Sequence, residues 1–186
     1  LGMGVAPSTG MKRGVVVNIE ASVQSIQQAV REAEMMAACK ITRVITGITG
    51  SHIRGRNSVG MVAVRDREVS PSDVAKVLET ARAINISTDQ RPLLVEPQEF
   101  IIDGQEVKEP IGMSGVRLES KVHIVTCAQS AAENIIKCVR RCGLEVEHLM
   151  LNPLAASMAT LTEDERELGV VLIDIGAGTT DIAVFS

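Results

Sequence analysis

A strand–turn–strand segment at residues 170–186 constrains the fold more than any other stretch of this chain. A run of aliphatic residues leads into Asp174, a turn with Gly176 and Gly178 follows, and a second apolar run begins after Asp181. Glycines let backbone N–H groups approach an anion because no side chain blocks them, and they also tolerate positive φ. The segment therefore predicts a buried strand followed by a hairpin whose turn binds phosphate.

The surroundings of the turn distinguish it from two common phosphate motifs. A P-loop needs Gly-Lys-Ser/Thr at the start of a helix, and a dinucleotide fingerprint needs a helix after its glycines, whereas an apolar strand follows here. Asp174 ends the first strand, where it can hold Mg²⁺ through water because Mg²⁺ keeps much of its hydration shell. An ordinary hairpin turn is the alternative. The residues expected to bind the cofactor are Asp174, Gly176, Ala177, Gly178, Thr179 and Thr180, and no catalytic residue is identified.

Composition excludes several classes of protein. Hydrophobic residues make up 45% of the chain but aromatic residues only 1%, so the core must be aliphatic. The net charge is -4 and the basic residues are not clustered, which argues against nucleic-acid binding. No apolar run approaches the roughly 18 residues of a membrane-spanning helix, and no signal peptide is evident. The four cysteines lie in apolar segments without zinc-like spacing, which predicts buried, reduced thiols of a cytosolic protein.

Hydrophobic periodicity predicts an α/β architecture. A Ser-Pro-Ser-Asp start at Ser70 predicts a capped helix whose apolar face continues to Ile84. Strands alternate with helices at both ends of the chain, while the middle block has the order of a small inserted α+β subdomain. Further helices are expected at 19–38, 131–142 and 153–161, strands at 43–48, 61–64, 93–102, 116–127 and 146–151, and irregular segments at 1–14, 47–60, 103–115 and 162–167.

The turn resembles the second phosphate loop of the actin, heat-shock-chaperone and sugar-kinase superfamily. The resemblance implies a partial actin-like (ribonuclease H-like) ATPase fold, in which the first Asp of the turn serves the metal and the backbone contacts the β- and γ-phosphates of ATP. Upstream, the segment from Asn152 to Ser157 resembles the connecting helix of this superfamily. The chaperones have an acidic residue at the position of Asn152, so a role in orienting the attacking water is not carried over.

Several stretches narrow the resemblance to FtsA-like bacterial cell-division proteins. The similarity covers the chain beyond about residue 10. The stretches are NIE at 18–20, GITGSHI at 47–53, PQEF at 97–100, GMSGVR at 112–117, KVHIVTC at 121–127 and LTEDERELG at 161–169. The resemblance implies that 1–54 and 128–161 form part of the first actin-like subdomain, that 55–127 is the inserted FtsA-type subdomain, and that 162–186 begins the second lobe.

FtsA-like proteins bind ATP with Mg²⁺, self-associate into filaments, link the tubulin-like FtsZ to the cytoplasmic membrane at the septum, and recruit later division proteins. The resemblance therefore implies a cytoplasmic protein on the inner face of the membrane at the division site. It implies slow or negligible ATP hydrolysis.

Both ends of the chain look severed, so we expect an internal fragment that is itself inactive. A first phosphate loop is expected before Leu1. An adenosine site, an FtsZ-docking subdomain and a C-terminal amphipathic membrane helix are expected after Ser186.

Two other functions remain open from the sequence. One is a pilus-assembly relative of FtsA that acts as an interaction module. The other is a small-molecule kinase of the same superfamily, which would need a substrate cleft and a catalytic carboxylate that the sequence does not identify.

Overall fold

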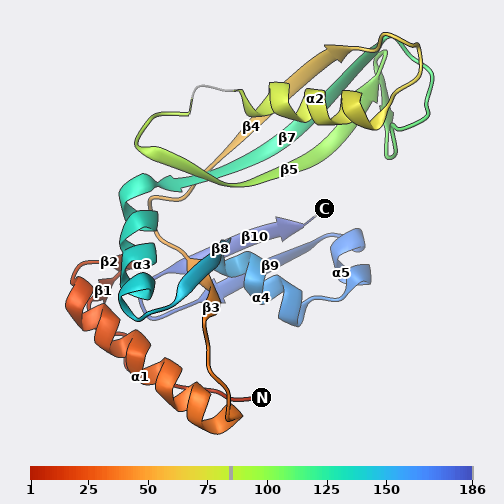
Figure 1. Ribbon diagram of the computed structural model, residues 1–186. Coiled ribbons are helices and arrows are strands. Elements are labelled where there is room, and N and C mark those ends of the chain that lie inside the picture. Colours follow the sequence, from red (N-terminus) through yellow and green to blue (C-terminus); the bar gives the residue numbers. More distant parts are fainter. Residues whose placement is uncertain (84–85, 186) are drawn as a thin grey trace. The chain divides into compact units, whose positions relative to one another are not determined.

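The computed structural model describes residues 1–83 and 86–185, which form two compact units (Figure 1). One unit comprises residues 1–52 and 128–186, and the other comprises residues 53–127. The α/β character predicted from the sequence is present in the first unit. The second unit is a small α+β structure inserted between two segments of the first.

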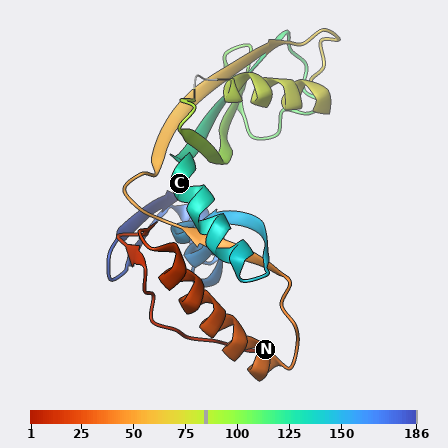
Figure 2. The same ribbon diagram turned by 60° about the vertical axis from the view of Figure 1, so that its left-hand side comes forward.

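The first unit contains three separate strand pairs and four helices among its described residues. The strands β3 and β8 pair in parallel, whereas β1 with β2 and β9 with β10 pair antiparallel. Helices α1 and α3 lie side by side in both views (Figures 1 and 2). The elements are β1 (Met11–Lys12), β2 (Val15–Val16), α1 (Ile19–Ala37), β3 (Arg43–Ile48), α3 (Gln129–Arg141), β8 (Glu145–Leu151), α4 (Asn152–Thr160), α5 (Glu163–Leu168), β9 (Val170–Ile175) and β10 (Thr180–Phe185).

Helices α1 and α3 pack against each other through aliphatic side chains. The side chain of Asn18 caps α1 by accepting a hydrogen bond of 3.1 Å from the Ala21 nitrogen. Val23 of α1 and Ile135 of α3 are buried. The Cys138 thiol on α3 points at the Ile19 carbonyl oxygen at 3.9 Å, so this cysteine serves the packing between the two helices.

The inserted unit is a four-stranded sheet with one helix across a face (Figures 1 and 2). The strand order is β4-β7-β5-β6, with β4 antiparallel to β7 and β5 antiparallel to β6. The predicted cap of α2 is confirmed: Ser70 and Asp73 exchange side-chain and backbone hydrogen bonds. Ile84 lies outside the described residues. The elements are β4 (Arg54–Ala63), α2 (Pro71–Arg82), β5 (Gln90–Ile102), β6 (Gln105–Val107) and β7 (Arg117–Ala128).

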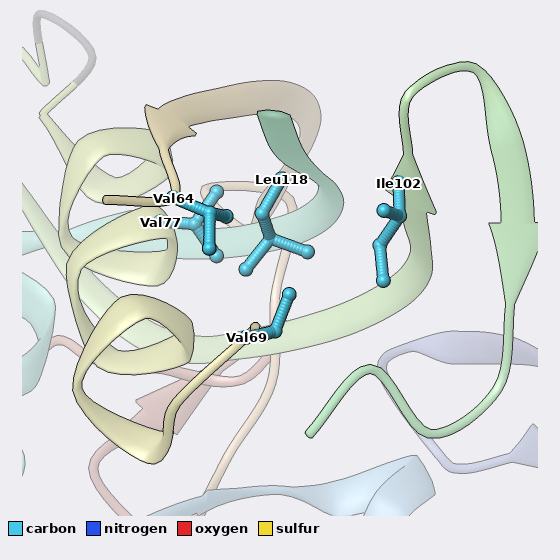
Figure 3. Close-up of a cluster of buried hydrophobic side chains, with 5 residues drawn as sticks. All are labelled: Val64, Val69, Val77, Ile102 and Leu118. Atoms are coloured by element: carbon cyan, nitrogen blue, oxygen red, sulfur yellow. The ribbon is translucent and has the colours of Figure 1, made fainter. Parts of the chain in front are cut away.

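An aliphatic core joins α2 to this sheet, as the near absence of aromatic residues requires. Its buried side chains converge from α2, β5, β7 and the segment between β4 and α2 (Figure 3). A second small cluster, Ala81, Val122 and Ile124, continues it along the helix. The buried residues of the main cluster are Val64, Val69, Val77, Ile102 and Leu118.

The glycines near residue 60 are not turn residues, so the expectation of an irregular stretch at 47–60 is wrong in its second half. Gly55 and Gly60 both lie inside β4. A Cβ on Gly60 would clash with the Val77 carbonyl oxygen and would lie 2.7 Å from the Ala81 nitrogen. Glycine therefore marks the place where the backbone of α2 approaches the strand.

Three other segments that were expected to be irregular contain regular structure. Segment 1–14 includes β1, which pairs with β2. Residues 162–167 are expected to be a charged linker, but 163–167 belong to α5 and Thr162 caps this helix through a capping box with Glu165. The segment 103–115 contains β6, which follows an Asp103-Gly104 turn with φ of 50° and 91°. Both signals, a Thr-x-x-Glu cap and an Asp-Gly hairpin turn, are present in the sequence.

The expectation of buried thiols is correct for Cys127 and Cys138 and wrong for Cys39, which is exposed. Cys39 follows the left-handed residue Ala38 (φ 52°) that ends α1, so it lies beyond the packed face of that helix. Burial raises the pKa of the Cys127, Cys138 and Cys142 thiols. Among the described residues, no helix is long and apolar enough to cross a bilayer.

We predict that Gly60→Ala destabilises the inserted unit by about 2 kcal/mol, because the new methyl group must displace the backbone of α2. Val59→Ala is the control, since Val59 lies on the same strand with 57% of its surface exposed. Urea denaturation with hydrogen exchange of the β7 amides measures both changes. Equal stability of the two variants would show that the close approach of α2 to β4 is not a tight contact.

Candidate phosphate site

The turn between β9 and β10 is an exposed four-residue hairpin loop. Its last ladder pair is Ile175 with Thr180, and the Gly176 nitrogen donates a hydrogen bond of 2.9 Å to the Thr179 carbonyl oxygen. Residues 176–178 are exposed. The loop is closed at its base by the strands, while its small residues leave the backbone accessible, which is what an anion-binding turn requires.

Gly176 and Gly178 serve the turn through their lack of a side chain and not through positive φ. Neither is among the glycines with φ in the left-handed region. A Cβ on Gly176 would lie 3.3 Å from the Thr179 carbonyl oxygen, and one on Gly178 would lie 3.3 Å from the Arg13 Cα. Positive φ therefore does not account for glycine at either position, whereas close approach of neighbouring protein atoms does.

Two carboxylates lie directly opposite each other at the base of the turn. Asp174 of β9 pairs in register with Asp181 of β10, and both side chains are half-buried. Directly opposed residues of an antiparallel pair share a face of the sheet. The structure thus adds Asp181 to the candidate site, although the sequence interpretation assigned only Asp174 to the metal.

The predicted site residues separate onto two faces of the hairpin. Thr180 pairs with Ile175, so its side chain lies on the face opposite to Asp174. Its hydroxyl does not join the carboxylates, and its contribution to an anion site is restricted to the backbone. Thr179 is half-buried within the loop, and Ala177 is at its exposed tip.

A threonine at the end of β3 holds one of the two carboxylates. The Thr49 hydroxyl donates a hydrogen bond to Asp181 Oδ2 at 2.5 Å. Strand β3 ends one residue earlier, at Ile48, so the parallel pair β3–β8 positions this hydroxyl. Thr49 was not predicted as a site residue because 132 positions of sequence separate it from Asp181.

Helix α4 packs against two of the three strand pairs of this unit, β3–β8 and β9–β10. It follows β8 directly and contacts β3, β9 and β10 as well. At its first residue, the side-chain oxygen of Asn152 occupies the space where Gly47 would carry a Cβ. Asn152 is therefore packed against the backbone of β3, which accounts for a small residue at position 47.

One face of the β9–β10 hairpin is apolar and exposed, in contrast to the buried strand predicted from the sequence. Its side chains are 55–79% exposed. The side chains of the other face are half-buried, and both strands contact α4. The run of aliphatic residues was typical of a strand covered on both sides. The exposed residues are Val171, Ile173, Ile175, Ile182 and Val184.

The donors at this site suit Mg²⁺ bound together with phosphate. Carboxylates and hydroxyls are hard oxygen ligands, and Mg²⁺ usually binds one or two carboxylates plus phosphate oxygens and water. Within residues 1–83 and 86–185, no group of three or more His, Cys, Asp or Glu side chains could form a metal cage. The pair Asp174 and Asp181 therefore suits an ion that also binds phosphate oxygens, and not a structural metal held by protein side chains alone.

Similarity to known proteins defines the class of protein to which the chain belongs. Residues 50–126 match the family described as the SHS2 domain inserted in FtsA. The fold is similar to that of a chain in a PilM-PilN type IV pilus biogenesis complex, with a TM-score of 0.60 and 20% identity over 96% of this chain and 48% of that chain. The chain therefore has the predicted actin-like fold with an inserted small subdomain.

Sequence comparison identifies the family. The chain is 59% identical to the cell division protein FtsA of Pseudomonas aeruginosa, 56% to that of Neisseria meningitidis and 47% to that of Escherichia coli. Each match covers 100% of this chain and 44–45% of the relative. The chain belongs to the FtsA family of cell-division proteins, and it spans less than half the length of these relatives.

Proposed function

We propose that this chain provides the phosphate-binding half of the Mg·ATP site of an FtsA cell-division protein. The observation that carries the proposal is the exposed Gly176–Gly178 turn directly above the opposed carboxylates Asp174 and Asp181. The turn offers backbone N–H groups to the β- and γ-phosphates. The carboxylates would hold Mg²⁺, which when bound would offset the negative charge of the phosphates.

The proposed site is incomplete within this chain. Phosphoryl transfer uses several phosphate- and metal-holding parts together. The chain spans 45% of the length of its Pseudomonas aeruginosa relative, so a first phosphate loop and an adenosine-binding wall would come from other parts of the full-length protein. Asn152 stands where the chaperones have an acidic residue, and the absence of a carboxylate to orient the attacking water supports slow or negligible hydrolysis.

Residues 162–186 are proposed to begin the second lobe of the actin-like fold. The exposed aliphatic face of β9–β10 supports this assignment, because a contiguous exposed apolar patch is commonly covered by another part of the protein. Residues 1–54 and 128–161 are proposed to belong to the first subdomain, and 55–127 to the inserted one.

The proposed cellular role follows from membership of the FtsA family. In this role the full-length protein binds ATP, forms filaments, links FtsZ to the inner face of the cytoplasmic membrane at the septum, and recruits later division proteins. The fold alone is shared with a pilus-biogenesis protein and does not discriminate between roles. The identity of 40–59% to FtsA proteins over the whole chain favours division over pilus assembly or a small-molecule kinase.

We predict that Asp174→Ala weakens Mg·ATP binding by the full-length protein about tenfold to a hundredfold, because the metal loses a carboxylate partner. Titration calorimetry at fixed Mg²⁺ measures the change, and binding of ATP in EDTA should differ little between the two proteins. Asp164→Ala, on the exposed surface of α5, is the control and should bind as wild type. Unchanged affinity of Asp174→Ala would remove this residue from the site.

The same titration on the 186-residue chain should give no saturable binding, because one phosphate turn without a base-binding wall holds ATP weakly. Micromolar affinity of the 186-residue chain for Mg·ATP would contradict the proposal that this chain provides only half of the site.

Cosedimentation tests the cellular role. We expect the full-length protein to carry FtsZ into the pellet with lipid vesicles in an ATP-dependent manner. FtsZ that stays in the supernatant, with intact vesicle binding, would contradict the link. ATP-dependent phosphorylation of a small molecule would instead support the alternative function, a small-molecule kinase.

A further inference from the structure

A basic hairpin turn lies against the phosphate turn. Strands β1 and β2 are joined by Arg13 and Gly14, whose φ values of 51° and 78° are both positive, as in a type I′ turn. A Cβ on Gly14 would lie 2.7 Å from the Thr49 carbonyl oxygen. The tip of this hairpin is therefore fixed against the residue that holds Asp181.

Arg13 itself contacts the phosphate turn. Its Cα and its nitrogen would lie 3.3 and 3.4 Å from a Cβ on Gly178. The Arg13 carbonyl oxygen lies 3.3 Å from the corresponding position on Gly50. The backbone of Arg13 is thus held between the end of β3 and the turn, and its side chain starts within reach of any anion that the turn binds.

The charge of the site requires a cation from elsewhere in the fold. Residues 170–185 contain Asp174 and Asp181 but no Lys, Arg or His. A triphosphate brought next to two carboxylates is repelled by both, and Mg²⁺ compensates only part of that charge. Arg13 is exposed and makes no hydrogen bond or ion pair with the residues that the structure describes, so its guanidinium is available.

We propose that the Arg13 guanidinium binds phosphate oxygens of the nucleotide held by the Gly176–Gly178 turn, which makes it a positioning residue for the polyphosphate. The proposal rests on the proposed Mg·ATP site. Arginine suits this role because its planar, permanently charged fork donates two parallel hydrogen bonds to a phosphate. The β1–β2 hairpin would then be part of the nucleotide site and not merely an edge of the fold.

Calorimetry on the full-length protein tests this proposal with four proteins: wild type, Arg13→Gln, Arg13→Lys and Arg31→Gln. Arg31 is an exposed arginine on α1 and serves as the matched control. We expect Arg13→Gln to bind Mg·ATP about tenfold more weakly, Arg13→Lys to recover part of the loss, and Arg31→Gln to match wild type. Adenosine binding should be the same in all four, because it carries no phosphate.

The outcomes separate the two proposals. If Arg13→Gln binds Mg·ATP as tightly as wild type while Asp174→Ala binds it more weakly, the proposed role of Arg13 is wrong and the proposed Mg·ATP site is supported. If Arg13→Gln loses affinity for adenosine and Mg·ATP alike, Arg13 acts only through the fold and the proposal is also wrong. Absence of Mg·ATP binding by the wild-type protein would overturn both proposals together.

Discussion

The opposition of Asp174 and Asp181 across the β9–β10 hairpin is the constraint on which the rest of the site depends. Two like charges directly opposite each other on one face of a sheet repel, and this costs a few tenths of a kcal/mol or more. The hydrogen bond from Thr49 stabilises one carboxylate, but it supplies no positive charge. The arrangement is therefore suited to a state in which a cation lies between the carboxylates and the phosphates above them.

Glycines, which have no side chain, allow elements of the molecule to approach one another closely. Gly178 allows Arg13 to lie against the phosphate turn, and Gly14 allows the same hairpin to lie against Thr49. Gly60 performs the equivalent function in the inserted unit, where it admits the backbone of α2. In a chain without Trp or Tyr, close backbone approach replaces large side chains as the means of joining elements.

Local sequence signals predicted local structure well. The sequence correctly predicts the cap at Ser70 and the α/β alternation, because each depends on a few neighbouring residues. The prediction of a turn-rich stretch up to Gly60 is wrong, because Gly60 lies in β4 and allows contact with α2, a helix that follows later in the chain. Thr49 was missed for the same reason, since only the folded chain brings it to Asp181. Asp181 could have been found, because a four-residue loop places it opposite Asp174.

Hydrogen exchange of the backbone amides of residues 176–180, measured in the full-length protein, tests the central claim most directly. If the turn binds the phosphates of the nucleotide, Mg·ATP slows exchange of these amides and Mg²⁺ with adenosine does not. The exposed amides of Ala177 and Gly178 exchange fast without ligand, whereas the Gly176 amide is partly protected by its hydrogen bond to the Thr179 carbonyl oxygen. Slowed exchange elsewhere in the protein, with residues 176–180 unchanged by Mg·ATP, would contradict a phosphate site at this turn.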